Sequence, residues 1–168
     1  VLKGIAMNCG VAINNEDFIK NVYNRMDSKF GEYIFLPKEG LSRVANTDGF
    51  PQLSQIAYDE LGNEQGHLIA IPLNQEGYLK VLSPKSTEVD MIQQDIFNPE
   101  KDLKLYVYIY AIFSKGPEYT VKLMQQLVNT MSTLPNGFTA DSCLFMESIS
   151  TCGNKTSERL GLSLAYSY

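Results

Sequence analysis

The side chains best suited to nucleophilic chemistry are one histidine, His67, and three cysteines, Cys9, Cys143 and Cys152. A thiolate activated by an imidazole could attack a carbonyl carbon, but the two groups would have to meet in the folded chain. Nothing in their spacing predicts such a meeting. The cysteines lack the Cys-x-x-Cys spacing of a metal site, and a single histidine adds too few ligands. We therefore expect no metal site, three free thiols, and a His67 that begins a strand beside a turn.

Three pairs of carboxylates could do general acid–base work: Glu16 and Asp17, Asp59 and Glu60, and Glu100 and Asp102. Each pair falls at a predicted helix start, strand end or polar loop, where acidic residues usually cap a helix or face water. The sequence contains no glycine-rich phosphate-binding motif and no Gly-x-Ser-x-Gly nucleophile motif. We therefore predict no catalytic residue and no cofactor, and we expect that the protein is not an enzyme.

A row of tyrosines, Tyr106, Tyr108 and Tyr110, recurs at every second residue. Aromatic side chains on one face of a sheet can stack on single-stranded bases, but such surfaces normally carry many lysines and arginines. Only Lys104 and Lys115 flank this row, and the whole chain has a net charge of −5. The row is more typical of a core or a subunit interface, and we predict no specific nucleic-acid binding.

The tyrosines belong to the most apolar run of the chain, residues 103–113, which is too short for a membrane helix of about twenty residues. Successive side chains of this run point to opposite faces, and both faces are apolar or aromatic, which predicts a central strand. The chain begins with Val1, which indicates either a trimmed initiator methionine, as we expect, or a removed leader.

Hydrophobic periodicity predicts two amphipathic helices, over residues 16–30 and 117–134, in a single domain that spans residues 1–168. Alternating or β-rich runs bounded by turn residues predict the strands, at residues 32–36, 53–61, 67–73, 78–82, 103–113, 138–149 and 158–168. The fold class is α+β: a mostly antiparallel sheet packed by two amphipathic helices and ending in strand, helix and β-hairpin.

Residues 83–102 form a long polar excursion with two lysines and five acidic residues. Ordering about twenty residues costs on the order of 1–2 kcal/mol each in backbone entropy. We expect the segment to be ordered only against a neighbouring subunit. The predicted partner contacts lie there and in the tyrosine row: Glu88, Asp90, Met91, Ile92, Asp95, Ile96, Phe97, Tyr106, Tyr108 and Tyr110.

The order of elements in residues 16–30 and 103–168 resembles that of the tail-terminator and tail-completion proteins of long-tailed bacteriophages. The step Gly49-Phe50-Pro51 also looks like that family's entry into its first long strand. The separate strand at residues 78–82 departs from the family's pattern. The resemblance implies a structural ring subunit, typically one of six copies, that contacts the tail tube and the head-side connector. It also implies a protein of the virion, assembled in the host cytoplasm without a membrane partner.

Two other functions stay open on the residues alone. The first is an extracytoplasmic binding domain or pilus-associated domain, which a disulfide between Cys143 and Cys152 would stabilise. The second is a small enzyme or ligand-binding domain with a pocket of convergent polar groups.

Overall fold

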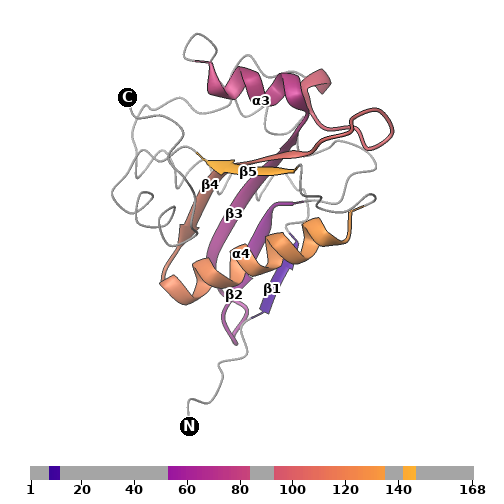
Figure 1. The fold of residues 1–168 in the computed structure, drawn as a ribbon. Helices are drawn as coiled ribbons and strands as arrows, with labels where there is room; N and C mark the ends of the chain where they lie inside the picture. Colours follow the sequence, from indigo (N-terminus) through magenta and orange to yellow (C-terminus); the bar gives the residue numbers. More distant parts are fainter. Residues whose placement is uncertain (1–7, 12–52, 84–92, 135–141, 147–168) are drawn as a thin grey trace.

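The computed structural model describes residues 8–11, 53–83, 93–134 and 142–146, and in them a five-stranded sheet is the central element (Figure 1). The strands stand in the order β1-β2-β3-β4-β5. The strands are β1 (Asn8–Val11), β2 (Gln55–Tyr58), β3 (Glu64–Leu73), β4 (Tyr106–Ser114) and β5 (Cys143–Met146); the helices are α3 (Gln75–Leu82), the short 3₁₀ helix η2 (Gln93–Asp95) and α4 (Pro117–Ser132). Neighbouring strands are antiparallel except β4 and β5, which are parallel.

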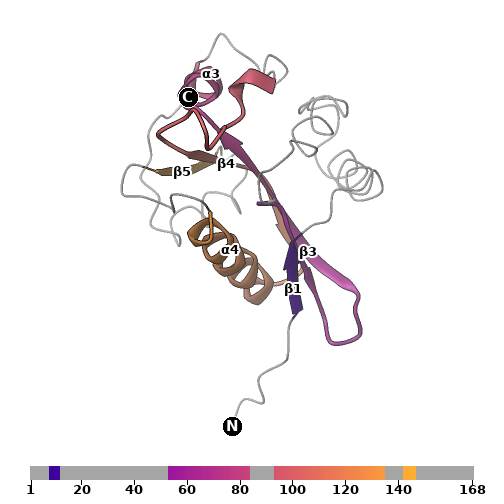
Figure 2. The ribbon, with the colours of Figure 1, turned by 90° about the vertical axis from the view of Figure 1, so that its right-hand side faces the viewer.

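Helix α4 covers one face of the sheet (Figure 2). Gly116 is its N-cap residue and Pro117 stands in its first turn, where a residue without an N–H costs no hydrogen bond. The helix buries a stripe of apolar side chains against β2, β3 and β4: Leu123, Met124, Leu127 and Met131. The predicted helix after the central strand is therefore confirmed, and its apolar stripe forms one of the two cores.

Helix α3 lies at the far end of β3 and corrects the predicted strand at residues 78–82. Asn74 caps it, because its Oδ1 accepts a hydrogen bond from Gly77 N at 3.0 Å. Tyr78 and Val81, three residues apart, then pack on the face of the sheet opposite to α4. The short run Tyr-Leu-Lys-Val-Leu suits a strand as well as a helix. The cap and the tertiary packing decide for the helix.

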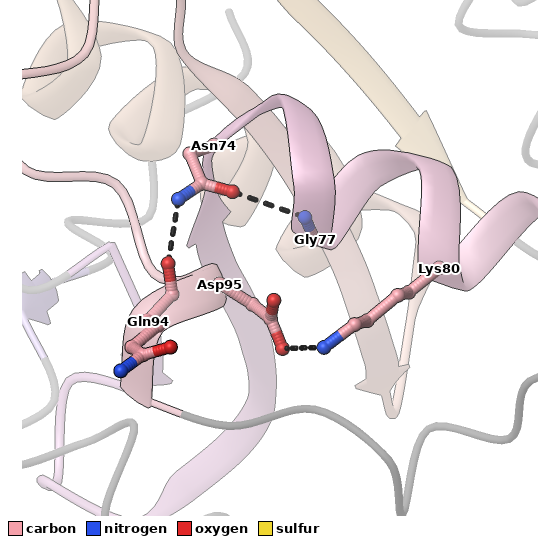
Figure 3. Close-up of polar contacts among 5 residues, drawn as sticks. All are labelled: Asn74, Gly77, Lys80, Gln94 and Asp95. Atoms are coloured by element: carbon pink, nitrogen blue, oxygen red, sulfur yellow. Dashed lines mark hydrogen bonds and ion pairs between the residues drawn. The ribbon is translucent and has the colours of Figure 1, made fainter.

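A polar cluster fastens α3 to η2 (Figure 3). Asn74 Nδ2 donates to Gln94 O at 2.7 Å, and Lys80 Nζ stands 2.8 Å from Asp95 Oδ2, a carboxylate that is almost fully buried. Asn74 N also donates to Asp95 O. A methyl group on Gly77 would come within 3.0 Å of Asp95 Cβ, so only glycine lets the two segments approach this closely.

The structure differs from the expectation for residues 83–102, because residues 93–102 pack on their own chain. Ile96 pairs with Leu73 in an isolated bridge and is buried, and Phe97 is buried in the core under α4. Phe97 N donates to Pro72 O at 3.1 Å. Residues 84–92 lie outside the described part, as do the first predicted helix, the strand at residues 32–36 and the strand at residues 158–168.

The α+β fold class is confirmed, with a mostly antiparallel sheet and helices packed on it. The structure also explains why Pro72 is tolerated within β3. The pairing of β2 with β3 ends at Leu68, so Pro72 lies where β3 has no β2 neighbour.

The turn between β2 and β3 is organised by the carboxylate of Asp59. Its Oδ1 accepts hydrogen bonds from Leu61 N and Asn63 N, and its Oδ2 accepts one from Gln65 Nε2 at 2.7 Å. Gly62 has a φ of +81°, which lets the turn close. The hydrogen bond from the Asn63 backbone, and the weaker bonds beside it, favour the ionised carboxylate. They lower the pKa of Asp59 below its ordinary value of 3.8.

We expect an NMR titration to find the pKa of Asp59 below 3.8. Because the folded pKa is lowered, the turn's contribution to stability is fully present above the unfolded pKa and is lost as pH falls through the folded pKa. In the variant Asn63→Ala, which loses a side-chain donor to the carboxylate, the pKa should rise toward 3.8. A titration midpoint of wild type at or above 3.8 would contradict this account of the turn.

Candidate functional site

The described pairing of β4 with β5 covers the first half of β4. Tyr106 to Ile109 pair with Cys143 to Met146, and no described residue continues the pairing toward Ser114. Burial changes at the same place: residues 106–110 are buried, whereas residues 111–114 are half-buried. We call the β5-facing side of residues 110–114 the open edge, because in the described structure its backbone groups face no strand.

The open edge begins at a β-bulge in β4. Ile69 of β3 pairs with Ala111, and the next residue, Ala70, pairs with Ile109, so Tyr110 is an extra residue on β4 in this ladder. A bulge bends its strand, interrupts the ladder and redirects backbone groups, and bulges are common beside active sites. The bulged residue, Tyr110, therefore directly follows the last described β4–β5 pair, Ile109 with Met146.

The chain passes directly from the open edge into α4. Ser114 Oγ lies 2.8 Å from Gly116 O and 2.6 Å from Thr120 Oγ1. Ser114 has a single hydroxyl proton, so if it donates to Gly116 O then Thr120 donates to Ser114. Lys115 N donates to Gln65 O at 2.8 Å. These bonds fix the start of α4 relative to the last residues of β4.

Gly66 of β3 allows this junction to lie close to the sheet. A methyl group at position 66 would stand 2.7 Å from Phe113 O and 3.0 Å from Ser114 Cα, and both are backbone atoms that cannot move away cheaply. Side chains larger than hydrogen would therefore push the end of β4 outward.

The tyrosine row lies on the opposite side of β4 from α4, where it packs β5 and α3 against the strand. Tyr78 stacks on Tyr106 with ring centroids 4.3 Å apart, and Phe145 of β5 stacks on Tyr108 at 5.1 Å. The row is thus part of the core, as one of the two sequence interpretations had it, and it holds β5 beside the first half of β4.

His67 is buried in β3 and forms no pair with Cys143. Its ring stacks on Phe113 at 5.7 Å between centroids, and its Nδ1 lies 3.4 Å from Glu64 Oε1. His67 faces Phe113 and Cys143 faces Tyr106, which are seven positions apart along β4, or about 20 Å. Cys143 is a free thiol. The side chain of Cys9 and all of Cys152 are outside the described part.

Six of the ten predicted partner contacts are buried within this chain: Asp95, Ile96, Phe97, Tyr106, Tyr108 and Tyr110. The other four, Glu88, Asp90, Met91 and Ile92, lie outside the described residues. A partner contact through any of the ten stays a prediction.

The two carboxylate pairs within the described residues, at 59–60 and 100–102, stand in turns. Asp102 Oδ2 accepts a hydrogen bond from Asn98 N at 2.7 Å, and Asp59 organises its own turn. Glu16 and Asp17 lie outside the described part. Within the described residues, no three side chains of His, Cys, Asp or Glu gather as a metal site would require. None of the helices described is both long and apolar enough to span a membrane.

The sequence interpretation did not predict that the strand near residue 145 pairs parallel with β4. The hairpin that it predicted with residues 158–168 lies outside the described residues. One signal was present: a strand, a helix that starts at Pro117 and a further strand form the pattern of a βαβ unit. Such a unit places its two strands parallel, because the helix carries the chain back to the starting end of the sheet.

No protein-family profile matches the chain, and no curated protein matches its sequence. Solved structures do match it. An aminoglycoside acetyltransferase from an uncultured soil metagenomic sample has 13% identity and a TM-score of 0.55, over 98% of this chain and 96% of that one. A ribosomal-protein-alanine N-acetyltransferase from Brucella melitensis biovar Abortus 2308 has 12% identity and the same TM-score of 0.55, over 97% of this chain and 96% of that one.

These likenesses contradict the prediction of a bacteriophage tail terminator. Both matched structures are acetyltransferases, not tail proteins, so the predictions of a structural ring subunit, a non-enzyme and a virion location were wrong. The alternative of an extracytoplasmic or pilus-associated domain is also unsupported. The error has a physical origin, because the order of helices and strands along a chain does not fix which strands pair. Self-association remains a prediction from the sequence.

The likeness extends over nearly the whole of both chains, and at 12–13% identity it establishes the fold alone. This chain therefore shares its fold with these two acetyltransferases.

Proposed function

We propose that this protein transfers an acyl group from a thioester to a primary amine. In this reaction the amine nitrogen forms a bond to the thioester carbonyl carbon and the carbon–sulfur bond breaks. The proton that the amine loses is balanced by the proton that the leaving thiolate gains. The fold shared with an aminoglycoside acetyltransferase and with a ribosomal-protein-alanine N-acetyltransferase supports the reaction class.

The observation that carries the proposal is the open edge of β4, which starts at the Tyr110 bulge, directly after the last described pair of β4 with β5. The pantetheine arm that carries biological acyl thioesters is an extended chain with two amide groups. An extended chain with amides can pair with the edge of a strand as an added strand does. The half-buried residues 111–114 offer that edge without a charged side chain.

The acidic balance of the chain bears on the acceptor. A net charge of −5 attracts cations and raises their local concentration, and most primary amines are cations at neutral pH. We therefore expect polyamines, amino sugars and basic peptide amines to be better acceptors than neutral or anionic amines of the same size.

The test is a thiol-release assay with the full-length protein, acetyl-coenzyme A and a panel of cationic, neutral and anionic amines. We expect thiol release that depends on both the donor and a cationic amine, with the acetylated amine identified by mass spectrometry. Thiol release without an acylated amine would mean thioester hydrolysis and would contradict the proposal. Absence of any acylated product across the panel would contradict it as well.

A further inference from the structure

The start of α4 follows the open edge directly along the chain, so a pantetheine arm that runs along this edge toward Ser114 would bring the diphosphate of a nucleotide-bearing donor to that start. A diphosphate is typically bound there by several unpaired backbone N–H groups, and glycines let the backbone approach the phosphates. The residues from 114 onward read Ser-Lys-Gly-Pro-Glu-Tyr-Thr, with a single glycine.

Three of the five backbone nitrogens at residues 116–120 have no N–H to offer a phosphate or already donate within the helix. Pro117 has no N–H. Tyr119 N and Thr120 N both donate to Gly116 O, at 3.1 Å and 3.4 Å. The hydroxyls of Ser114 and Thr120, which could also donate to a phosphate, lie 2.6 Å apart and are hydrogen-bonded to each other.

The local charge is also unsuited to a diphosphate. The carboxylate of Glu118 folds back over Gly116, where a methyl group would stand 2.7 Å from Glu118 Oε2. A negative charge in the first turn stabilises the positive end of the helix dipole, and it occupies the place that an anionic ligand would use. The nearest lysine along the chain, Lys115, points its Nζ at Glu64 O, 3.1 Å away, on the neighbouring hairpin.

From this disagreement we infer that the protein recognises its acyl donor through the pantetheine arm and not through a nucleotide diphosphate. The inference rests on the proposed acyl transfer and names the donor class: acyl thioesters of pantetheine, whatever group the pantetheine carries at its other end. Glu118 is then a specificity residue that disfavours anionic donors and leaves neutral ones unaffected.

Binding tests this inference separately from turnover. Calorimetry with the full-length protein should give dissociation constants for coenzyme A and for pantetheine that agree within about tenfold, since the diphosphate adds little. Coenzyme A binding more than about 100-fold tighter than pantetheine would overturn the inference even if acyl transfer is observed. Failure of both compounds to bind would overturn it too, whereas binding of both without amine acylation would refute only the proposed function.

A charge variant gives a second measurement. Glu118→Gln should tighten coenzyme A binding by about two- to fivefold, the effect of one charge at a helix start, and leave pantetheine binding unchanged. The control is Glu100→Gln, an exposed carboxylate in the turn at residues 98–102, which should change neither constant. If Glu118→Gln weakens coenzyme A binding or changes both ligands equally, Glu118 is not the specificity residue and the inference fails.

Discussion

Replacing Leu127 with alanine is expected to lower the free energy of unfolding by about 2–5 kcal/mol, the usual cost of truncating a buried leucine. Leu127 has no exposed surface and lies in the core between α4 and the sheet, together with Leu68, Val107 and Ile109. The chain has no tryptophan, so urea unfolding is best followed by far-ultraviolet circular dichroism.

The matched control is the next residue on the same helix. Val128 is 51% exposed, and Val128→Ala should change the free energy of unfolding by no more than about 0.5 kcal/mol. Both substitutions raise helix propensity, by no more than about 0.7 kcal/mol, so a loss of about 2–5 kcal/mol confined to Leu127→Ala measures burial. Equal effects from the two substitutions would mean that α4 presents a different face to the sheet.

Replacing Gly66 with alanine is expected to lower kcat/KM for acyl transfer by about 100-fold, because a displacement of about 1 Å at a site can cost that much. The added methyl group would meet Phe113 O and Ser114 Cα and push the end of β4, with the start of α4, away from the sheet. The assay is the thiol-release measurement with the best amine of the panel.

The control for Gly66→Ala is a glycine in the same hairpin that has open space around it. A methyl group at Gly62 would meet nothing within 4 Å, and the φ of +81° at this position is one that asparagine tolerates. Gly62→Asn should keep full activity. Circular dichroism must show that Gly66→Ala is folded. A folded Gly66→Ala protein with wild-type kcat/KM would show that the junction of β4 and α4 does not position the site.

Some elements follow from local sequence. The run at residues 103–113 is apolar or aromatic on both faces, which predicts a central strand. The structure places β4 between two strands, with a core on each of its faces. Helix α4 follows from Gly116-Pro117 and from an apolar stripe at spacings of three and four. In both cases the pattern of apolar residues continues over many residues. A strand pattern of this length cannot be read as a helix, nor a helix pattern as a strand, so the type of element is fixed.

Other elements depend on contacts between distant residues. Whether residues 75–82 form a helix or a strand is decided by the Asn74 cap and by the stacking of Tyr78 on Tyr106, a residue 28 positions later in the chain. The bonds from Asn74 to Gln94 and from Lys80 to Asp95 act in the same way. The Asn74 cap is local, but the partners in the other three contacts lie 15 to 28 positions apart, so no local periodicity could reveal them.

The sequence by itself determined the α+β class, the central strand β4, the helix α4 that follows it and the absence of a long apolar span, because each rests on local periodicity and composition. Only the tertiary structure decided that β5 returns parallel to β4 and that Tyr110 is an extra residue in the ladder with β3. These are properties of pairing between strands, and a one-residue shift in register leaves the sequence of each strand unchanged while it moves every side chain to the other face. The candidate site consists mainly of backbone N–H and C=O groups at the edge of β4. Every sequence carries these groups, so no residue type in this sequence could mark the site.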